Sequence, residues 1–114
     1  MHISIAKDFS DVPWGRFPSD GDFCGQNFRE LFLVPALKNH DSVTVDLDGV
    51  EGLGSSFLDE AFGGLIRKGH ASEADLGAKL TVTTSQPEYE MYLDLVRRYI
   101  RQAQEEADRE LVRV

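Results

Sequence analysis

Ser55 and Ser56 stand where a glycine-rich turn runs into a helical pattern, and these are the residues best placed for chemistry in this chain. The first turn of a helix presents unpaired N–H groups and the positive end of the helix dipole. An anion is stabilised there, including a phosphoryl group carried by a serine. Serine is also a common helix cap. The two serines are therefore candidate phosphoacceptors, and a capping role for Ser55 is the alternative.

Asp46 and Asp48 suggest a second kind of chemistry, because they lie two residues apart at the end of a predicted buried strand. The segment 46–50 (DLDGV) is similar to the nucleophile motif of haloacid-dehalogenase-type phosphatases, in which such a pair holds Mg²⁺ and the first aspartate attacks phosphorus. That chemistry also needs a lysine and a further acidic pair on later strands, whereas only one long helix is predicted after Thr84. A Mg²⁺-dependent phosphatase is therefore the alternative, and both aspartates are more simply interpreted as strand-end and turn residues.

Other catalytic and metal-binding arrangements lack their residues. The nucleophile elbow of a serine hydrolase needs glycine two positions before and two positions after its serine, and neither Ser55 nor Ser56 has both. The three histidines and the single cysteine do not have the spacing of metal ligands. We therefore predict a non-enzymatic protein with no cofactor and no metal ion.

Strand and helix patterns alternate along the chain and must position these residues. Apolar residues at period two predict strands at 2–7, 42–47 and 79–84, and apolar residues three and four apart predict helices at 26–37, 55–68 and 85–111. Ser85 and Glu88 form the pattern of a capping box at the last helix. The order predicts an α/β domain with a mostly parallel sheet of about four strands, helices packed on it and a long C-terminal helix.

A long loop, residues 8–25, precedes the first helix. Eighteen residues is long for a connection within a compact domain, and such loops are often functional. Trp14 and Phe17 are candidate partner contacts because aromatic side chains dominate binding hot spots, and packing at the edge of the core is the alternative. Arg16 lies between them in sequence and is a further candidate contact.

The composition limits the class of partner. The chain has 114 residues, the size of one domain, and its formal charge of −8 would repel nucleic acid and anionic lipid. A basic protein surface is compatible with that charge. Cys24 has no second cysteine to pair with, the chain opens on no basic and apolar leader, and no apolar run approaches the roughly 18 residues of a membrane span. A cytoplasmic protein is therefore expected.

The last predicted helix becomes strongly charged towards its end. We expect residues 104–114 to form a charged helical extension of a single domain that spans 1–114. Within this extension Leu111, Val112 and Val114 offer an apolar contact for a dimer.

The segment 43–66 (VTVDLDGVEGLGSSFLDEAFGGLI) resembles the recognition turn of STAS domains, the superfamily of sulfate-transporter and anti-sigma-factor-antagonist domains. It is closer still to a bacterial STAS-like family of unknown function. The sequence pattern of that family has a Gly-Arg-aromatic loop with a later Asp-Gly, a helix with phenylalanine followed by arginine, and a Ser-Ser-Phe-Leu-x-Glu-Ala-Phe-Gly segment. The corresponding stretches here are 15–17 (GRF), 20–21 (DG), 28–30 (FRE) and 55–63 (SSFLDEAFG).

The resemblance implies a small STAS-like domain that regulates a partner by binding it. In STAS antagonists the serine directly after an Asp is phosphorylated by a kinase of the histidine-kinase-like ATPase fold, and phosphorylation breaks the complex with that kinase. That serine corresponds to Ser55, although Gly54 replaces the Asp and Phe57 replaces a Gly. We therefore expect a histidine-kinase-like ATPase or an anti-sigma-type regulator as partner, with a constitutive scaffold as the simpler alternative. The residues expected to contact the partner are Gly54, Phe57, Leu58, Trp14, Arg16 and Phe17.

Overall fold

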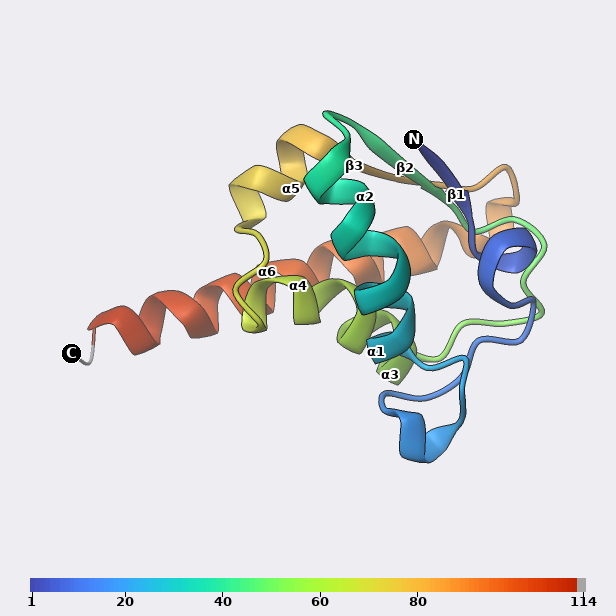
Figure 1. Ribbon diagram of the computed structural model, residues 1–114, viewed down its shortest axis with the longest axis horizontal. Coiled ribbons are helices and arrows are strands. Elements are labelled where there is room, and N and C mark those ends of the chain that lie inside the picture. Colours follow the sequence, from blue (N-terminus) through green and yellow to red (C-terminus); the bar gives the residue numbers. More distant parts are fainter. Residues whose placement is uncertain (113–114) are drawn as a thin grey trace.

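The computed structural model describes residues 1–112 and shows an α/β fold around a parallel sheet (Figure 1). The strands are β1 (His2–Ser4), β2 (Val43–Asp46) and β3 (Leu80–Thr83), in the spatial order β1-β2-β3. Both strand pairs are parallel, and Val45 lies opposite Ile3 on one side. The predicted α/β class is confirmed, and within residues 1–112 the sheet has three strands where about four were expected.

The first strand ends three residues earlier than predicted because the chain turns at once into η1 (Ile5–Phe9), a single wide helical turn. The Ser4 hydroxyl accepts a hydrogen bond from the Lys7 N–H, and the Asp8 carboxylate accepts one from the Ser4 N–H at 2.8 Å. These local bonds compete with strand pairing and stop it. The loop that follows contains one short 3₁₀ turn, η2 (Pro18–Asp20).

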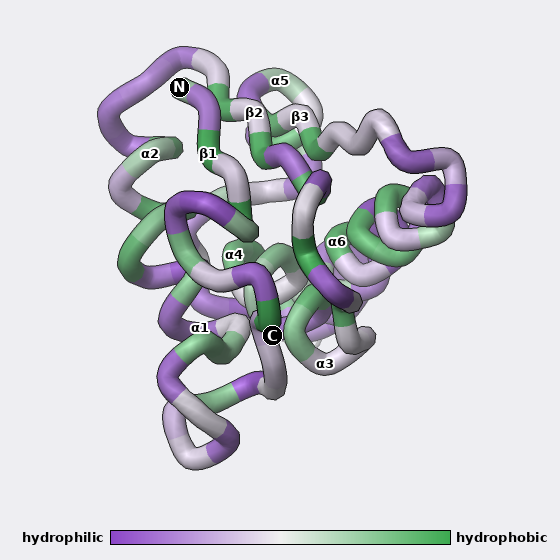
Figure 2. The backbone as a smooth tube through the Cα atoms, turned by 90° about the vertical axis from the view of Figure 1, so that its right-hand side faces the viewer, coloured by the Kyte–Doolittle hydropathy of each residue, from purple (hydrophilic) through white to green (hydrophobic). Residues whose placement is uncertain are grey.

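The helices cover one face of the sheet and leave the other open (Figures 1 and 2). Consecutive parallel strands joined by right-handed crossovers place their helices on the same side. The strand residues alternate accordingly. Ile3, Val43 and Val45 are buried beneath the helices. On the open face, Thr44 is half-buried and Thr81 is exposed.

The first long helix, residues 25–39, consists of α1 (Gly25–Phe28), a π-helical turn η3 (Arg29–Leu33) and α2 (Val34–Asn39). The sequence predicts that Pro35 ends or kinks this helix, yet the helix continues for four more residues. Proline lacks the N–H that would continue the α-helical pattern, and the wider turn just before it shifts that pattern. The helix therefore passes through the proline.

The second long helix, residues 55–67, repeats this construction with α3 (Ser55–Leu58), a π-helical turn η4 (Asp59–Gly63) and α4 (Gly64–Arg67). A short helix, α5 (Glu73–Lys79), then leads into β3. π-Helical turns are uncommon and gather at sites where side chains must be placed unusually. Both of these turns carry charged residues that are described below.

The last helix begins later than predicted. A 3₁₀ turn, η5 (Pro87–Tyr89), precedes α6 (Glu90–Val112). The predicted capping box of Ser85 and Glu88 is wrong, because the Ser85 hydroxyl donates its hydrogen bond to the Asp48 carboxylate instead.

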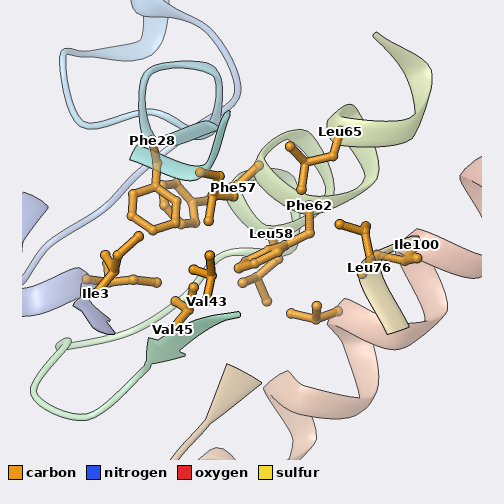
Figure 3. Packing of buried hydrophobic residues seen from close by; sticks show 14 of the residues in the cluster. Ile3, Phe28, Val43, Val45, Phe57, Leu58, Phe62, Leu65, Leu76 and Ile100 are labelled. Carbon is orange, nitrogen blue, oxygen red and sulfur yellow. The ribbon is translucent and has the colours of Figure 1, made fainter. Parts of the chain in front are cut away.

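The core lies between the sheet and the two long helices, and phenylalanines dominate it (Figure 3). Phe28 of the first long helix packs against Phe57 of the second, with ring centroids 5.9 Å apart. Phe9 from η1 approaches both rings. Fully burying one such side chain contributes about 1.5–3 kcal/mol, so this cluster is a major source of stability.

A charged pair crosses the same helix–helix contact. Arg29 is 1% exposed and Glu60 is 5% exposed. The Arg29 Nη1 donates to the Glu60 carboxylate at 2.7 Å and to the Glu60 backbone carbonyl, while Nε donates to the Glu30 carboxylate at 3.2 Å. A buried charge is costly to desolvate, and here each charge is paired and hydrogen-bonded in compensation.

Glycines bring the two helices close enough for this pair. A Cβ on Gly25 would lie 2.7 Å from the Phe57 carbonyl oxygen and 3.0 Å from the Ala61 nitrogen, and neither backbone atom can move without moving its helix. A Cβ on Gly64 would overlap the Arg29 guanidinium. The spacing of the two long helices therefore depends on residues without side chains.

α6 runs along the second long helix and then projects beyond the core (Figure 1). Its buried residues end at Ala103, whereas Leu111 and Val112 are 74% and 85% exposed. The extension predicted from residue 104 is therefore helical as far as Val112. The third residue of the predicted dimer contact, Val114, lies outside the described residues.

Breaking the buried pair from one side should destabilise the fold strongly. Arg29→Met or Glu60→Leu alone takes the buried hydrogen-bonded partner from the remaining charge, and breaking a buried pair in this way costs about 3–5 kcal/mol. The double substitution removes both charges and should cost clearly less than the two single substitutions added together. Guanidinium-induced unfolding, followed by circular dichroism, measures each free energy.

The exposed pair of Arg97 and Asp94 provides the control, because their side chains are 72% and 71% exposed. Arg97→Met should cost less than about 1 kcal/mol. Additive losses in the Arg29 and Glu60 double variant would show that the two side chains do not act as a pair.

Candidate functional site

The two serines lie at the start of the second long helix, and Ser55 is its first residue. Gly54, with an extended backbone, occupies the cap position, and no side chain caps this end. The capping alternative for Ser55 is therefore wrong. Ser55 is exposed and Ser56 is half-buried, so the loop before the first long helix does not seal them from the surface.

That loop nevertheless lies beside the serines and forms a cavity with them. The cavity has a volume of about 330 Å³. Its walls come from the loop on one side and from the serine turn on the other: Trp14, Gly15, Arg16, Asp20, Gly54, Ser55 and Ser56. The structure thus brings both serines together with three of the six residues predicted to contact a partner, Trp14, Arg16 and Gly54, although about forty positions separate the loop from the turn in sequence.

Backbone hydrogen bonds hold the loop in this position. The Trp14 N–H donates to the Phe23 carbonyl and the Gly25 N–H donates to the Gly15 carbonyl, both at 2.9 Å. The Asp20 carboxylate closes the tip by accepting from the Arg16 N–H at 3.0 Å. Gly15 has a φ of 81°, which side-chain-bearing residues rarely adopt. The loop is therefore an ordered wall of the cavity.

Arg16 ties the loop to the helix that carries the serines. Its Nη1 donates to the Asp59 carboxylate at 2.8 Å, and it lies 3.8 Å from the Glu60 carboxylate. Arg67 donates to the other oxygen of Asp59 at 3.1 Å. The Arg16 side chain is 38% exposed, so it is both a tether for the loop and a surface residue.

Trp14 and Phe17 are exposed on this loop, with 67% and 45% of their surfaces accessible to water. Of the two interpretations left open, packing at the edge of the core and display at the surface, the structure favours display. Trp14 is also the single tryptophan of the chain, so its fluorescence reports on this loop alone.

Phe57 and Leu58, both predicted to contact a partner, do not reach the surface. Each is 0% exposed and packs in the core beneath the serine turn (Figure 3). They follow the two serines directly and lie on the inner face of the helix, because the hydrophobic cluster around Phe28 holds that face. We therefore correct their assignment from partner contacts to supports of the turn.

Of the two aspartates of the phosphatase alternative, Asp48 holds the loop after β3 and Asp46 holds the turn after β2. The Asp48 carboxylate accepts hydrogen bonds from the Ser85 hydroxyl, the Thr84 hydroxyl at 2.7 Å and the Ser85 N–H. These bonds, the Ser85 hydroxyl foremost, lower the pKa of Asp48 below its usual value. Asp46 accepts from the Asp48 N–H. In residues 1–112 no three His, Cys, Asp or Glu side chains gather as they would around a metal ion.

Sequence reasoning missed the acidic residues that hold the site together. Glu30 receives the Arg29 Nε and lies 3.5 Å from His70. Burial works to raise the pKa of Glu30, but the hydrogen bond and charge of Arg29 and the nearby His70 outweigh it, and the pKa is lowered. The signal that could have revealed the network is the arginine at Arg29, which follows Phe28 on the buried side of a helix.

Comparison with known families decides the classification. Residues 24–90 match the family model described as STAS-like domain of unknown function (DUF4325). The chain belongs to this STAS-like family. No curated protein and no solved structure matches the chain. The segment that matches the STAS-like domain includes the serine turn and both long helices, whereas Trp14, Arg16 and Phe17 precede it.

Within the described part of the chain, no helix of this STAS-like domain combines the length and the apolar character that a membrane span requires.

The bonds to Asp48 should make stability depend on pH. A lowered pKa means that the charged carboxylate stabilises the fold above its unfolded pKa, near 3.8, and that this stabilisation is lost as the pH falls through the folded pKa. Asp48→Ala should therefore lower the Tm at pH 7 and lower it progressively less as the pH falls below about 4. Thermal unfolding by circular dichroism measures both.

The exposed Asp41 serves as the control, since Asp41→Ala should change the Tm little at either pH. An Asp48→Ala loss that is the same at pH 7 and at low pH would show that the charge of Asp48 is not what stabilises the turn.

Proposed function

We propose that this STAS-like domain is a non-enzymatic regulatory module that binds a protein partner through the cavity at the serine turn. The serine-loop surface is defined as Trp14, Arg16, Phe17, Gly54, Ser55 and Ser56. The observation that carries the proposal is that an ordered loop displays an exposed tryptophan in the same cavity as an exposed serine.

The exposed aromatic residues support a protein as the ligand. Tryptophan is enriched among the residues that dominate protein–protein binding, and Trp14 and Phe17 keep most or nearly half of their surfaces in water. The loop is already ordered by backbone hydrogen bonds, which lowers the entropy that binding would cost. The formal charge of −8 favours a partner with a basic surface.

The nature of the partner follows from the resemblance to STAS antagonists. We propose a histidine-kinase-like ATPase or an anti-sigma-type regulator in the cytoplasm, with Ser55 as the position that this partner phosphorylates. Ser56 is the second candidate. The exposure of Ser55 at the first position of the helix supports this choice, because a kinase must reach the hydroxyl.

A phosphate on Ser55 would act mainly on the partner. The helix N-terminus tolerates negative charge, so the fold itself is not disrupted. At the surface, however, the phosphate would lie on the helix that carries Asp59, and it would compete with Asp59 for Arg16. Added charge and desolvation within an interface weaken it. The switch therefore consists of binding without phosphate and release with it.

The matched test compares the chain with its Ser55→Asp and Ser42→Asp variants. Ser42 is exposed beside β2 and lies outside the serine-loop surface, so Ser42→Asp adds the same negative charge away from that surface. The probe is a histidine-kinase-like ATPase from the same genome, preferably one encoded beside this gene. Titration followed by Trp14 fluorescence should show binding by the unmodified chain and by Ser42→Asp, and at least about tenfold weaker binding by Ser55→Asp.

Three results would contradict the proposal. Equal binding by Ser55→Asp and the unmodified chain would refute the switch and leave a constitutive scaffold. Binding that leaves the Trp14 fluorescence unchanged and survives Trp14→Ala would place the interface elsewhere. Binding of none of the genome's ATPases of this fold would refute the class of partner.

A further inference from the structure

A second concave surface lies at the open edge of the sheet beside β3. This groove has a volume of about 390 Å³ and is bounded by α5, β3 and α6. We call it the β3-edge groove. Its apolar lining consists of Leu76, Leu80, Val82, Leu93, Val96 and Ile100.

The backbone of β3 offers hydrogen-bonding groups to this groove. The Thr83 carbonyl accepts from the Leu47 N–H at 2.9 Å, so Thr83 directs its backbone groups at β2. Backbone direction alternates along a strand in a parallel pair, and Val82 therefore directs its N–H and C=O to the other side. The strand order β1-β2-β3 leaves no further strand on that side in the described part of the chain.

This edge strand contains no charged residue and no proline. Charged side chains, proline or a bulge usually discourage pairing at an edge, yet β3 reads Leu-Thr-Val-Thr. Leu80 and Val82 point to the helix side of the sheet but remain half-buried, unlike Val45 at 0% exposure in the central strand. Their incomplete burial shows that the helices leave room over this edge.

The position of α6 explains why the helices leave space over the β3 edge. Figure 2 shows it below β3 and further towards the open side of the sheet, so that it extends past the sheet like a shelf. Val96 and Ile100 are buried under this edge, while Leu93 is only half-buried. The groove between α6 and the free edge of β3 lies where one more strand of the sheet would be. The β3 strand of a second copy, Leu-Thr-Val-Thr, carries no charge that would meet the Arg97 side chain lining the groove.

We infer that the β3-edge groove binds an extended segment of a partner protein, which adds to β3 as a fourth strand of the sheet. The outward N–H and C=O of Val82 form the backbone hydrogen bonds with the added segment. The apolar lining receives every second side chain of that segment. This inference does not depend on the proposed function, because the groove shares no residue with the serine-loop surface.

The charged side chains at the β3-edge groove indicate which kind of segment would bind there. Two charged residues line the groove, Glu73 and Arg97. Glu73 is already paired with Arg101 at 3.0 Å, and Arg97 is paired with Asp94 at 2.9 Å. The two arginine side chains are 72% and 65% exposed, so their present ion pairs are weak and open to exchange. The complementary segment alternates β-branched or aliphatic residues with polar ones. It carries an acidic residue at the position that meets Arg97.

The test selects dodecapeptides from a random phage-displayed library on the full chain and measures their affinities by fluorescence anisotropy. Val82→Pro removes one outward N–H and should weaken the selected peptides at least about tenfold. His2→Pro is the matched control, since it makes the same change on the opposite edge strand β1 and should alter affinity less than about twofold. Arg97→Glu leaves the backbone intact and should weaken peptides that carry this acidic residue by about fivefold or more.

Amide chemical shifts of the ¹⁵N-labelled chain identify where the peptides bind. Shifts at 80–83 and 93–100 support the inference, and this readout with Arg97→Glu decides the matter if Val82→Pro fails to fold. Shifts confined to the serine-loop surface, affinities unaffected by both variants, or a library that yields no binding peptide would overturn it. A dimer of the chain alone that Val82→Pro dissociates would overturn it as well, because the occupant would then be a second copy.

Discussion

The contact on which the rest of this structure depends is the buried pair of Arg29 and Glu60 between the two long helices. A guanidinium and a carboxylate can share an apolar interior only when their hydrogen bonds are complete, and this requirement sets the distance between the helices. Gly25 and Gly64 permit that distance, because a Cβ would meet the backbone of the opposite helix at Gly25 and the Arg29 guanidinium at Gly64. The chain before Gly25 is thereby placed beside the chain before Ser55. The cavity with the serines is a consequence of how the helices pack.

The π-helical turns belong to the same arrangement. Arg29 begins one of them, and Asp59 and Glu60 begin the other. From this second turn Glu60 reaches inward to Arg29 while the neighbouring Asp59 reaches outward to Arg16 and Arg67. One short stretch of helix therefore both closes the core and fastens the loop. A charge introduced at its first residues would act at the surface, while the core beneath remains supported by buried phenylalanines.

The order of strands and helices could be predicted from the sequence, because apolar spacing reports directly on which face of an element is buried. The same spacing could not tell that Phe57 and Leu58 face the core and not a partner, since apolar residues serve both purposes. Ser85 satisfied the local rule for a helix cap, yet a carboxylate distant in sequence, Asp48, provided a better partner for it. The pairing of Arg16 with Asp59 joins segments more than forty residues apart, and no local pattern contains such information.

The central claim, that the close approach of the two helices positions both walls of the cavity at once, can be tested by hydrogen exchange on a Gly25→Ala variant. The Gln26 N–H bonds to the Arg16 carbonyl in the loop, and the Leu58 N–H bonds to the Gly54 carbonyl at the serine turn. The account predicts that the added methyl group, which meets the backbone of the opposite helix, makes both amides exchange faster together. Faster exchange at Gln26 with unchanged protection at Leu58 would show that the two walls are held independently, and would contradict it.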